Sequence, residues 1–153
     1  MIKREELAGM KLFSDFTDTE LDMIRMVAEV ERYPKEHQII VEGVRGEKLY
    51  LIAHGRASVI TAIEGAGEEE IKLLEKGDYF GEMSLIDDSP ISASVYSRDD
   101  VILFTIDRAA FAKLIDDEMP IANKILRTLI VNFSERARST TEKIGKFYQM
   151  SNF

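Results

Sequence analysis

The sequence predicts a mainly β fold with flanking α-helices, built as an antiparallel sandwich or barrel. Between about residues 31 and 106, short runs of β-branched and aromatic residues alternate with glycine-containing turns, which is typical of such folds. On both sides of this region, apolar residues recur at the spacing of a helix face. The 153 residues are expected to form one domain. It would have a helical lead-in at about 1–30, a β-roll at about 31–106 and C-terminal helices at about 107–148.

The helical lead-in is predicted from a start signal. Thr17 and Glu20 have the spacing of a capping box, in which each side chain binds a free backbone N–H at the helix start. Leu21, Ile24 and Val27 follow at helical spacing, which favours a helix with one buried face.

Strands are predicted in the middle region from alternating polarity. Leu49, Leu51 and Ala53 show the two-residue period of a half-buried strand. The predicted strands are Gln38–Val41, Lys48–Ala53, Arg56–Ile63, Glu70–Leu74 and Val101–Ile106.

Two helices are predicted after the strands, because Asp107 can cap the first and Pro120 suits the first turn of the second. Along the second helix a seam of apolar and small residues contains Ala122, Leu126, Leu129, Phe133, Ala137, Thr140, Ile144 and Phe147. A helix from Pro120 to Phe147 would be about 40 Å long, which exceeds what a small barrel needs to cover it. We therefore expect a homodimer through this helix. The alternatives are a helix folded back on its own domain or one frayed beyond Arg138.

Composition and charge narrow the function classes. A formal net charge of −8 disfavours nucleic acid as the partner, because that binding rests on phosphate neutralisation. The basic stretch from Lys124 to Lys146 is interpreted as the solvated face of a helix. The chain has no cysteine, which excludes disulfides and thiolate metal sites. No apolar run suits a signal peptide or a membrane span, so a cytoplasmic protein without membrane partners is expected.

The residues do not predict an enzyme. His37 and His54 lie in different segments without metal-ligand spacing. The acidic pairs at 87–88 and 99–100 fall in predicted turns, where aspartate commonly makes local hydrogen bonds. We expect no catalytic residue, no metal and no cofactor.

The most distinctive stretch runs from Gly77 to Leu85 and reads GDYFGEMSL. A strand-like run ends in a Gly-Asp turn, and Gly81 then frees the backbone where a short helical turn begins. Such a turn presents backbone N–H groups to an anion, while the carboxylate of Glu82 can accept hydrogen bonds from a sugar hydroxyl. A second stretch, PISASV, follows from Pro90.

These two stretches resemble the phosphate-binding cassette of the cyclic nucleotide-binding domain. This domain is the module of bacterial catabolite activators, protein kinase A regulatory subunits and cyclic-nucleotide-gated channels. Residues 12–24, 42–52, 55–59 and 107–114 are similar to other segments of the family and occur in the same order. The resemblance covers nearly the whole chain. It implies a double-stranded β-helix, or jelly roll, with an N-terminal helix and two C-terminal helices, of which the last is long.

The resemblance also implies a ligand and its binding residues. The ligand would be cAMP or cGMP. The binding residues would be Gly81, Glu82, Met83, Ser84, Ser92 and Ala93. Glu82 would accept from the ribose 2′-hydroxyl, and the others would offer backbone or hydroxyl donors to the phosphate. From the residues alone, Gly81 could instead serve a tight turn, and Glu82 could act on the dipole of the helical turn.

Ile91 departs from the family pattern, which usually has a phosphate-binding arginine at this position. An aliphatic side chain cannot pair with phosphate oxygens. A hydrogen bond to a charged group contributes about 1.5–3 kcal/mol, so its loss should weaken binding roughly 10- to 150-fold. Lys72, Arg98, Arg45 and Arg56 are other cations near the predicted site, but none has the spacing of the missing arginine.

These residues and the resemblance lead to two alternative functions. The first is a stand-alone regulatory sensor whose binding of cAMP or cGMP is weakened or lost because of Ile91. It would not bind DNA, since the helix-turn-helix domain of the family's transcription regulators is absent. The alternative is a ligand-free scaffold or dimerisation domain, in which Ile91 fills the pocket. An apolar pocket lined by Ile91, Met83 and Ile71 would suit a less anionic ligand.

Overall fold

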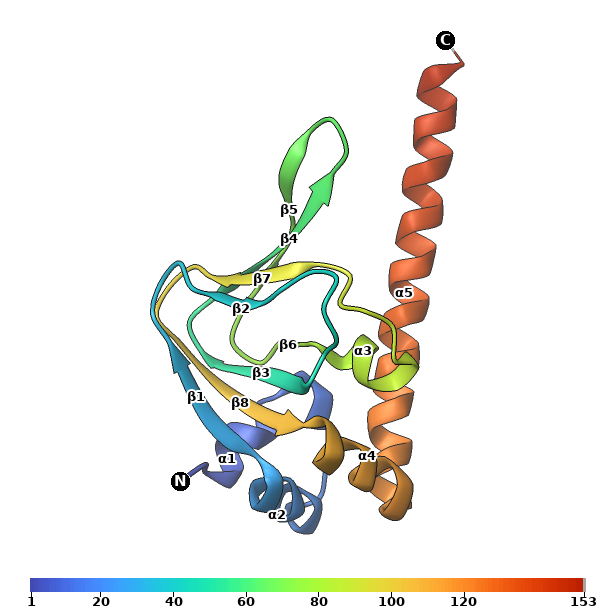
Figure 1. Cartoon of the computed structure of the whole chain (residues 1–153). Coiled ribbons are helices and arrows are strands. Elements are labelled where there is room, and N and C mark those ends of the chain that lie inside the picture. Colours follow the sequence, from blue (N-terminus) through green and yellow to red (C-terminus); the bar gives the residue numbers. More distant parts are fainter. Residues whose placement is uncertain (153) are drawn as a thin grey trace.

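The computed structural model describes residues 1–152 as a β-sandwich flanked by helices (Figure 1). The elements in chain order are α1 (Arg4–Ala8), the short 3-10 helix η1 (Lys11–Phe13), α2 (Asp18–Val27), β1 (Glu29–Tyr33), β2 (Gln38–Ile40), β3 (Lys48–His54), β4 (Ala57–Ile63), β5 (Gly67–Leu74), β6 (Tyr79–Phe80), α3 (Glu82–Asp87), β7 (Ser94–Ser97), β8 (Val101–Asp107), α4 (Arg108–Asp117) and α5 (Met119–Ser151).

The strands form two four-stranded antiparallel sheets, ordered β1-β8-β3-β6 and β2-β7-β4-β5. The predicted jelly roll with a helical lead-in and two closing helices is confirmed. Three strands that the sequence analysis did not predict are β1, β6 and β7. β1 reads EVERY and is largely charged, while β6 has two residues and β7 four, so neither shows a long apolar alternation.

The predicted helix starts are confirmed in their geometry. The Thr17 hydroxyl accepts from the N–H of Glu20 at 3.3 Å, and the Glu20 carboxylate accepts from the N–H of Thr17 at 2.8 Å. At α4 the Asp107 carboxylate accepts from the N–H of Ala110 at 2.7 Å. Both caps satisfy backbone donors that the first helical turn leaves free.

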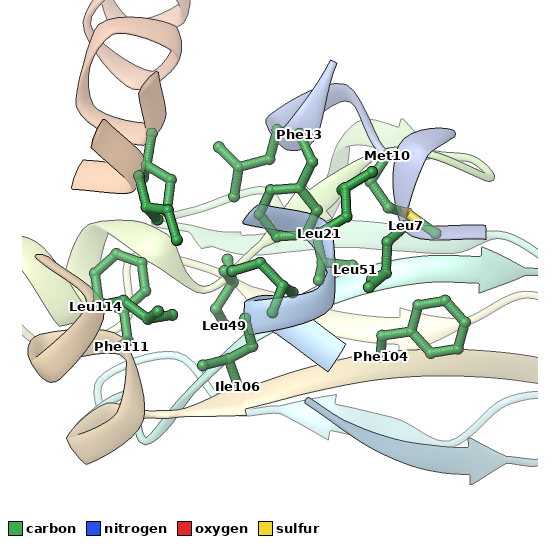
Figure 2. Close-up of a cluster of buried hydrophobic side chains, with 14 of the residues drawn as sticks. Leu7, Met10, Phe13, Leu21, Leu49, Leu51, Phe104, Ile106, Phe111 and Leu114 are labelled. Atoms are coloured by element: carbon green, nitrogen blue, oxygen red, sulfur yellow. The ribbon is translucent and has the colours of Figure 1, made fainter. Parts of the chain in front are cut away.

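The main core lies between the outer face of the β1-β8-β3-β6 sheet and the helices. Strand alternation divides β3 between two clusters: Leu49 and Leu51 face the helices, while Tyr50 and Ile52 face the inside of the sandwich. Figure 2 shows the helix-facing cluster, in which Leu49 and Leu51 lie among side chains of η1, α2 and α4. This core therefore attaches the lead-in and the closing helices to the same sheet.

α5 divides into two parts with different surroundings. In its proximal part, Ile121, Ala122, Ile125 and Leu129 are buried. From Arg136 to Asn152 every residue is exposed, and this distal part extends beyond the body on the side of the β4–β5 hairpin (Figure 1). Of the predicted dimer seam, Ala122 and Leu129 are therefore buried in the chain's own domain, and Phe133 packs against its core.

Among residues 1–152, none of the helices combines the length and the apolar character needed to cross a bilayer.

Candidate ligand-binding site

A cavity of about 700 Å³ lies between the sandwich, α3 and α5. Its lining includes every residue that the sequence analysis assigned to ligand binding. We call it the cassette pocket. The residues that line it are Ile40, Val59, Ile71, Lys72, Leu74, Tyr79, Phe80, Gly81, Glu82, Met83, Ser84, Asp87, Ser89, Pro90, Ile91, Ser92, Ala93, Val95, Glu135, Arg136, Ser139, Thr140 and Lys143.

Gly81 connects β6 to α3 in a conformation that favours glycine. Its φ is +86°, in the left-handed region. A Cβ at this position would lie 2.7 Å from the carbonyl oxygen of Lys48 and 3.2 Å from the ring of Tyr50. The turn is therefore pressed against β3, which fixes the first turn of α3 at the wall of the cassette pocket.

Glu82 is the buried charge of this site, with 4% of its surface exposed. Its Oε1 accepts from Nη2 of Arg136 at 3.3 Å. The guanidinium of Arg136 also lies against α3, because Nη1 is 3.8 Å from the Sδ of Met83. A buried carboxylate with one charged partner keeps acceptor capacity for hydroxyl donors, as ribose recognition requires.

One helical turn before Arg136, a second polar contact joins α5 to the cassette. The side-chain amide of Asn132 donates to the hydroxyl of Tyr79. Burial raises the pKa of Tyr79, which keeps its hydroxyl neutral. Asn132 and Arg136 are four residues apart and thus on one face of α5, so the helix contacts both ends of the Tyr79–Glu82 segment.

Ser84 uses its hydroxyl within the protein. The hydroxyl accepts from the N–H of Gly46 at 3.0 Å and donates to the carbonyl of Ser89 at 2.6 Å. A Cβ on Gly46 would lie 2.7 Å from the Cβ of Ser84, so the close approach requires glycine. The side chain of Ser84 is therefore a structural link between α3 and the β2–β3 turn, and its hydroxyl is not free for a ligand.

Ile91 lines the cassette pocket at the position of the missing arginine. Its backbone is fixed to the β2–β3 turn: its carbonyl accepts from Gly43 N–H, and its N–H donates to Val44 carbonyl, both at 2.8 Å. The side chain packs against the sandwich interior. Ser92 and Ala93, which follow it, also line the pocket. The part of the cassette pocket formed by Ile91 therefore has an apolar wall.

Arg108, at the start of α4, joins three segments. Its Nη2 donates to the carbonyls of Gly46 at 2.5 Å and Ser84 at 3.0 Å, and its Nη1 pairs with Asp88 at 2.6 Å. The sequence analysis did not identify this residue. No local pattern signals it, because its three partners are far from it in sequence.

Of the cations considered from the sequence, Lys72 lines the cassette pocket. Lys72 is paired with Val59 across β4 and β5, and Val59 with Val95 across β4 and β7, so these residues share the pocket-facing side of the sheet. The other cations contact acidic residues outside the pocket lining: Arg98 with Glu70 at 3.7 Å, Arg56 with Asp99 at 2.8 Å and Arg45 with Glu47 at 3.9 Å.

The sequence analysis missed the contribution of α5. Arg136, Ser139, Thr140 and Lys143 all line the cassette pocket, although their stretch was interpreted as a solvated face. The available signal was their spacing of three and four, which places them in one row with Asn132. Thr140, which was assigned to the dimer seam, belongs to this row.

No cluster of three or more metal-ligating side chains occurs within residues 1–152. The cassette pocket is thus a cavity with polar and apolar walls, whose central charged group is the buried Glu82.

Known proteins are similar to this chain in sequence and in fold. The cAMP-dependent protein kinase regulatory subunit of Pyricularia oryzae is 33% identical over 118 residues, which are 77% of this chain and 30% of that protein. A cyclic nucleotide-binding domain from Methylobacillus flagellatus has a crystal structure with a TM-score of 0.79 and 30% identity, covering 92% of this chain and 79% of that one. Thermus thermophilus catabolite activator protein gives a TM-score of 0.78 with 28% identity, covering 88% of this chain and 61% of that one.

The kinase regulatory subunit is much longer than the matched region, so this chain corresponds to one part of it. The family model described as "Cyclic nucleotide-binding domain" matches residues 30–118, which run from the second residue of β1 to just past the end of α4 and include the whole cassette. The resemblance inferred from the motifs is therefore confirmed: the chain belongs to the cyclic nucleotide-binding domain family.

Proposed function

We propose that this chain is a regulatory sensor that binds cAMP or cGMP in the cassette pocket, more weakly than a cassette with an arginine at position 91. One observation carries the proposal: an open cavity of about 700 Å³ contains the buried carboxylate of Glu82. The carboxylate has Arg136 as its one charged partner and keeps acceptor capacity, to which the ribose 2′-hydroxyl of a cyclic nucleotide can donate. The membership of the chain in a cyclic nucleotide-binding family supports the same ligand class.

In this proposal the site residues have distinct roles. Glu82 accepts from the ribose 2′-hydroxyl. The backbone at Gly81, Met83 and Ser84 faces the phosphate, since Ser84 already uses its hydroxyl internally. Ser92 and Ala93 complete that end of the pocket. Ile91 supplies apolar contact and no charge, which lowers the affinity for the anion.

Calorimetric titration with cAMP and then cGMP at moderate salt tests the proposal. We expect saturable binding, and we expect Ile91→Arg to tighten it about tenfold or more, because the added guanidinium pairs with the phosphate. The absence of heat and of a thermal shift at millimolar ligand, for the wild type and for a folded Ile91→Arg variant, would contradict it. The second candidate, a ligand-free scaffold, is favoured by the identity of Ile91 and would then be the better description.

We also propose that two copies associate through the distal part of α5. From Ile130 into this part, residues on one side of the helix recur at alternating spacings of four and three, the pattern of a coiled-coil seam: Ile130, Ser134, Ala137, Thr141, Ile144 and Tyr148, of which all but the half-buried Ser134 are exposed. Ile130, Ile144 and Tyr148 are 63%, 51% and 64% exposed, so the chain's own domain does not cover them.

Light scattering over a range of protein concentrations tests this association. We expect the mass of a dimer, and the mass of a monomer for Ile144→Glu, because a buried unpaired charge disrupts the seam. Lys146→Glu, off the seam, is the control. A wild-type monomer at high concentration would refute the association.

A further inference from the structure

We propose that Arg136 of α5 replaces the missing cassette arginine as the cation that binds the ligand's phosphate. This inference rests on the proposed function, since it assigns a partner to the phosphate of the ligand in the same pocket. The family's cation comes from the cassette itself, whereas this one comes from a helix 45 positions later in the chain.

The position of the guanidinium carries the inference. Its Nη2 lies 3.3 Å from Glu82 and its Nη1 lies 3.8 Å from the Sδ of Met83. Glu82 and Met83 are the first two residues of α3. The guanidinium therefore lies against the same helical turn whose backbone N–H groups would face the phosphate.

The guanidinium of Arg136 also has N–H donors that are not used by Glu82. It carries five N–H donors in a planar fork, and one of them is used by Glu82. Nη1 has only a thioether sulfur, a weak acceptor, as its contact. An arginine in this state can keep its bond to the carboxylate and pair with a phosphate oxygen on its other side. The side chain is 50% exposed, which leaves it room to turn toward a ligand.

The other cations of the pocket are placed less well. Lys72 projects from β5 and Lys143 from α5, about 10 Å further along the helix than Arg136 at 1.5 Å per residue. Neither makes a hydrogen bond or ion pair with a cassette residue within residues 1–152. Arg136 alone among the described lining cations contacts the cassette.

Local charge also favours this role. The lining holds three basic side chains and three carboxylates, Glu82, Asp87 and Glu135, so the pocket as a whole does not attract an anion. Binding a phosphate beside Glu82 therefore requires a cation close to both negative groups. Arg136 is the side chain already in that place.

The test compares a charged ligand with its neutral counterpart. Titrations with cAMP and adenosine are made on the wild type, on Arg136→Gln and on Arg138→Gln, a control arginine outside the pocket lining. We expect Arg136→Gln to weaken cAMP about tenfold or more and to change adenosine less than threefold. Arg138→Gln should change neither. Thermal unfolding checks that each variant is folded.

Other outcomes overturn the inference. If Arg136→Gln weakens cAMP and adenosine equally, Arg136 acts on ribose binding through Glu82 and not on the phosphate. If it leaves cAMP unchanged, another group holds the phosphate. If the wild type binds neither ligand at millimolar concentration, the proposed function itself fails, and this result is distinct from the other two.

A second experiment repeats the cAMP titrations of Arg136→Gln in the Ile91→Arg background. When Ile91→Arg supplies a cassette cation, the loss of cAMP affinity caused by Arg136→Gln should become at least threefold smaller, because the two arginines serve the same phosphate. Equal losses in the two backgrounds would mean independent roles and would count against the replacement.

Discussion

The proximal and distal parts of α5 belong to one continuous helix but have opposite surroundings. The proximal part places Ile121, Ile125 and Leu129 in the main core. The distal part places a polar row along the cassette pocket and leaves an apolar seam exposed. The comparison teaches that helical periodicity identifies a face without identifying what covers it. One part supports the fold, and the other is available for ligand and partner.

The largest expected effect concerns stability and should be confined to the proximal part. Ile125 is fully buried, so Ile125→Ala should lower the free energy of unfolding by about 2–5 kcal/mol, because it removes apolar contacts and leaves a cavity. Met150→Ala in the distal part, where the side chain is 78% exposed, should change it by less than about 0.5 kcal/mol. Urea denaturation measures both. Similar losses in the two variants would remove the distinction between the parts.

The next largest effect concerns the affinity for cAMP and should be confined to residues of the cassette pocket that contact the ligand. Glu82→Gln replaces the buried carboxylate by a neutral amide of similar size, so we expect cAMP binding to weaken about tenfold or more. Affinity for 2′-deoxy-cAMP should barely respond, because that ligand lacks the hydroxyl that Glu82 accepts from. Glu135→Gln is the matched control, because Glu135 lines the same pocket and makes no hydrogen bond to the cassette within residues 1–152. Equal weakening of both ligands would argue against ribose recognition by Glu82.

The smallest effect is a dependence on pH that should be found in the proximal part. Nζ of Lys124 donates to Oε2 of Glu20 on α2 at 2.6 Å, and this hydrogen bond is the main cause of the lowered pKa of Glu20. A lowered carboxyl pKa in the folded state stabilises the protein above the ordinary pKa of glutamate, and this contribution is lost as the pH falls through the folded pKa.

Glu20→Gln should therefore lower the free energy of unfolding by about 1 kcal/mol at neutral pH, and the gap to the wild type should narrow at an acidic pH, below the ordinary pKa of glutamate, as the pH falls through the lowered folded pKa. Denaturation at both pH values measures the gap. Glu142→Gln, on the exposed distal part, should show no such gap at either pH. A gap for Glu20→Gln that is constant with pH would mean that the packing of the side chain, and not its charge, is what stabilises the helix contact.

The fold could be predicted well from the sequence because its signals are local. The capping residues Thr17, Glu20 and Asp107 act within their own helical turns, and the glycine turns separate the predicted strands. The cassette motif supplied the rest through its resemblance to a known family. β1 and β6 were missed because pairing with a neighbouring strand, and not apolar alternation, makes them strands.

The candidate site could be predicted only in its cassette half. Gly81, Glu82 and Ile91 stand together in sequence, whereas Arg136 and Lys143 reach the same cavity from a helix that packs against it. Their charge alone indicates solvent exposure, and only the packing of Leu129 and its neighbours in the core aims them at the pocket. The same reason hides Arg108, whose contacts all cross between segments.

The bonds of the β2–β3 turn have a consequence for selectivity. Gly43, Val44 and Gly46 attach it to the loop at Ile91 and to Ser84, so the sugar-phosphate side of the cavity has a stiff wall. Another part of the wall comes from the edge strand β5, which pairs on one side only, with β4, and is exposed from Gly67 to Leu73, so it can yield more readily than the turn. Such a cavity should discriminate strictly among sugars and phosphates while tolerating changes in the base, so modified nucleobases should bind with nearly the affinity of the parent compound.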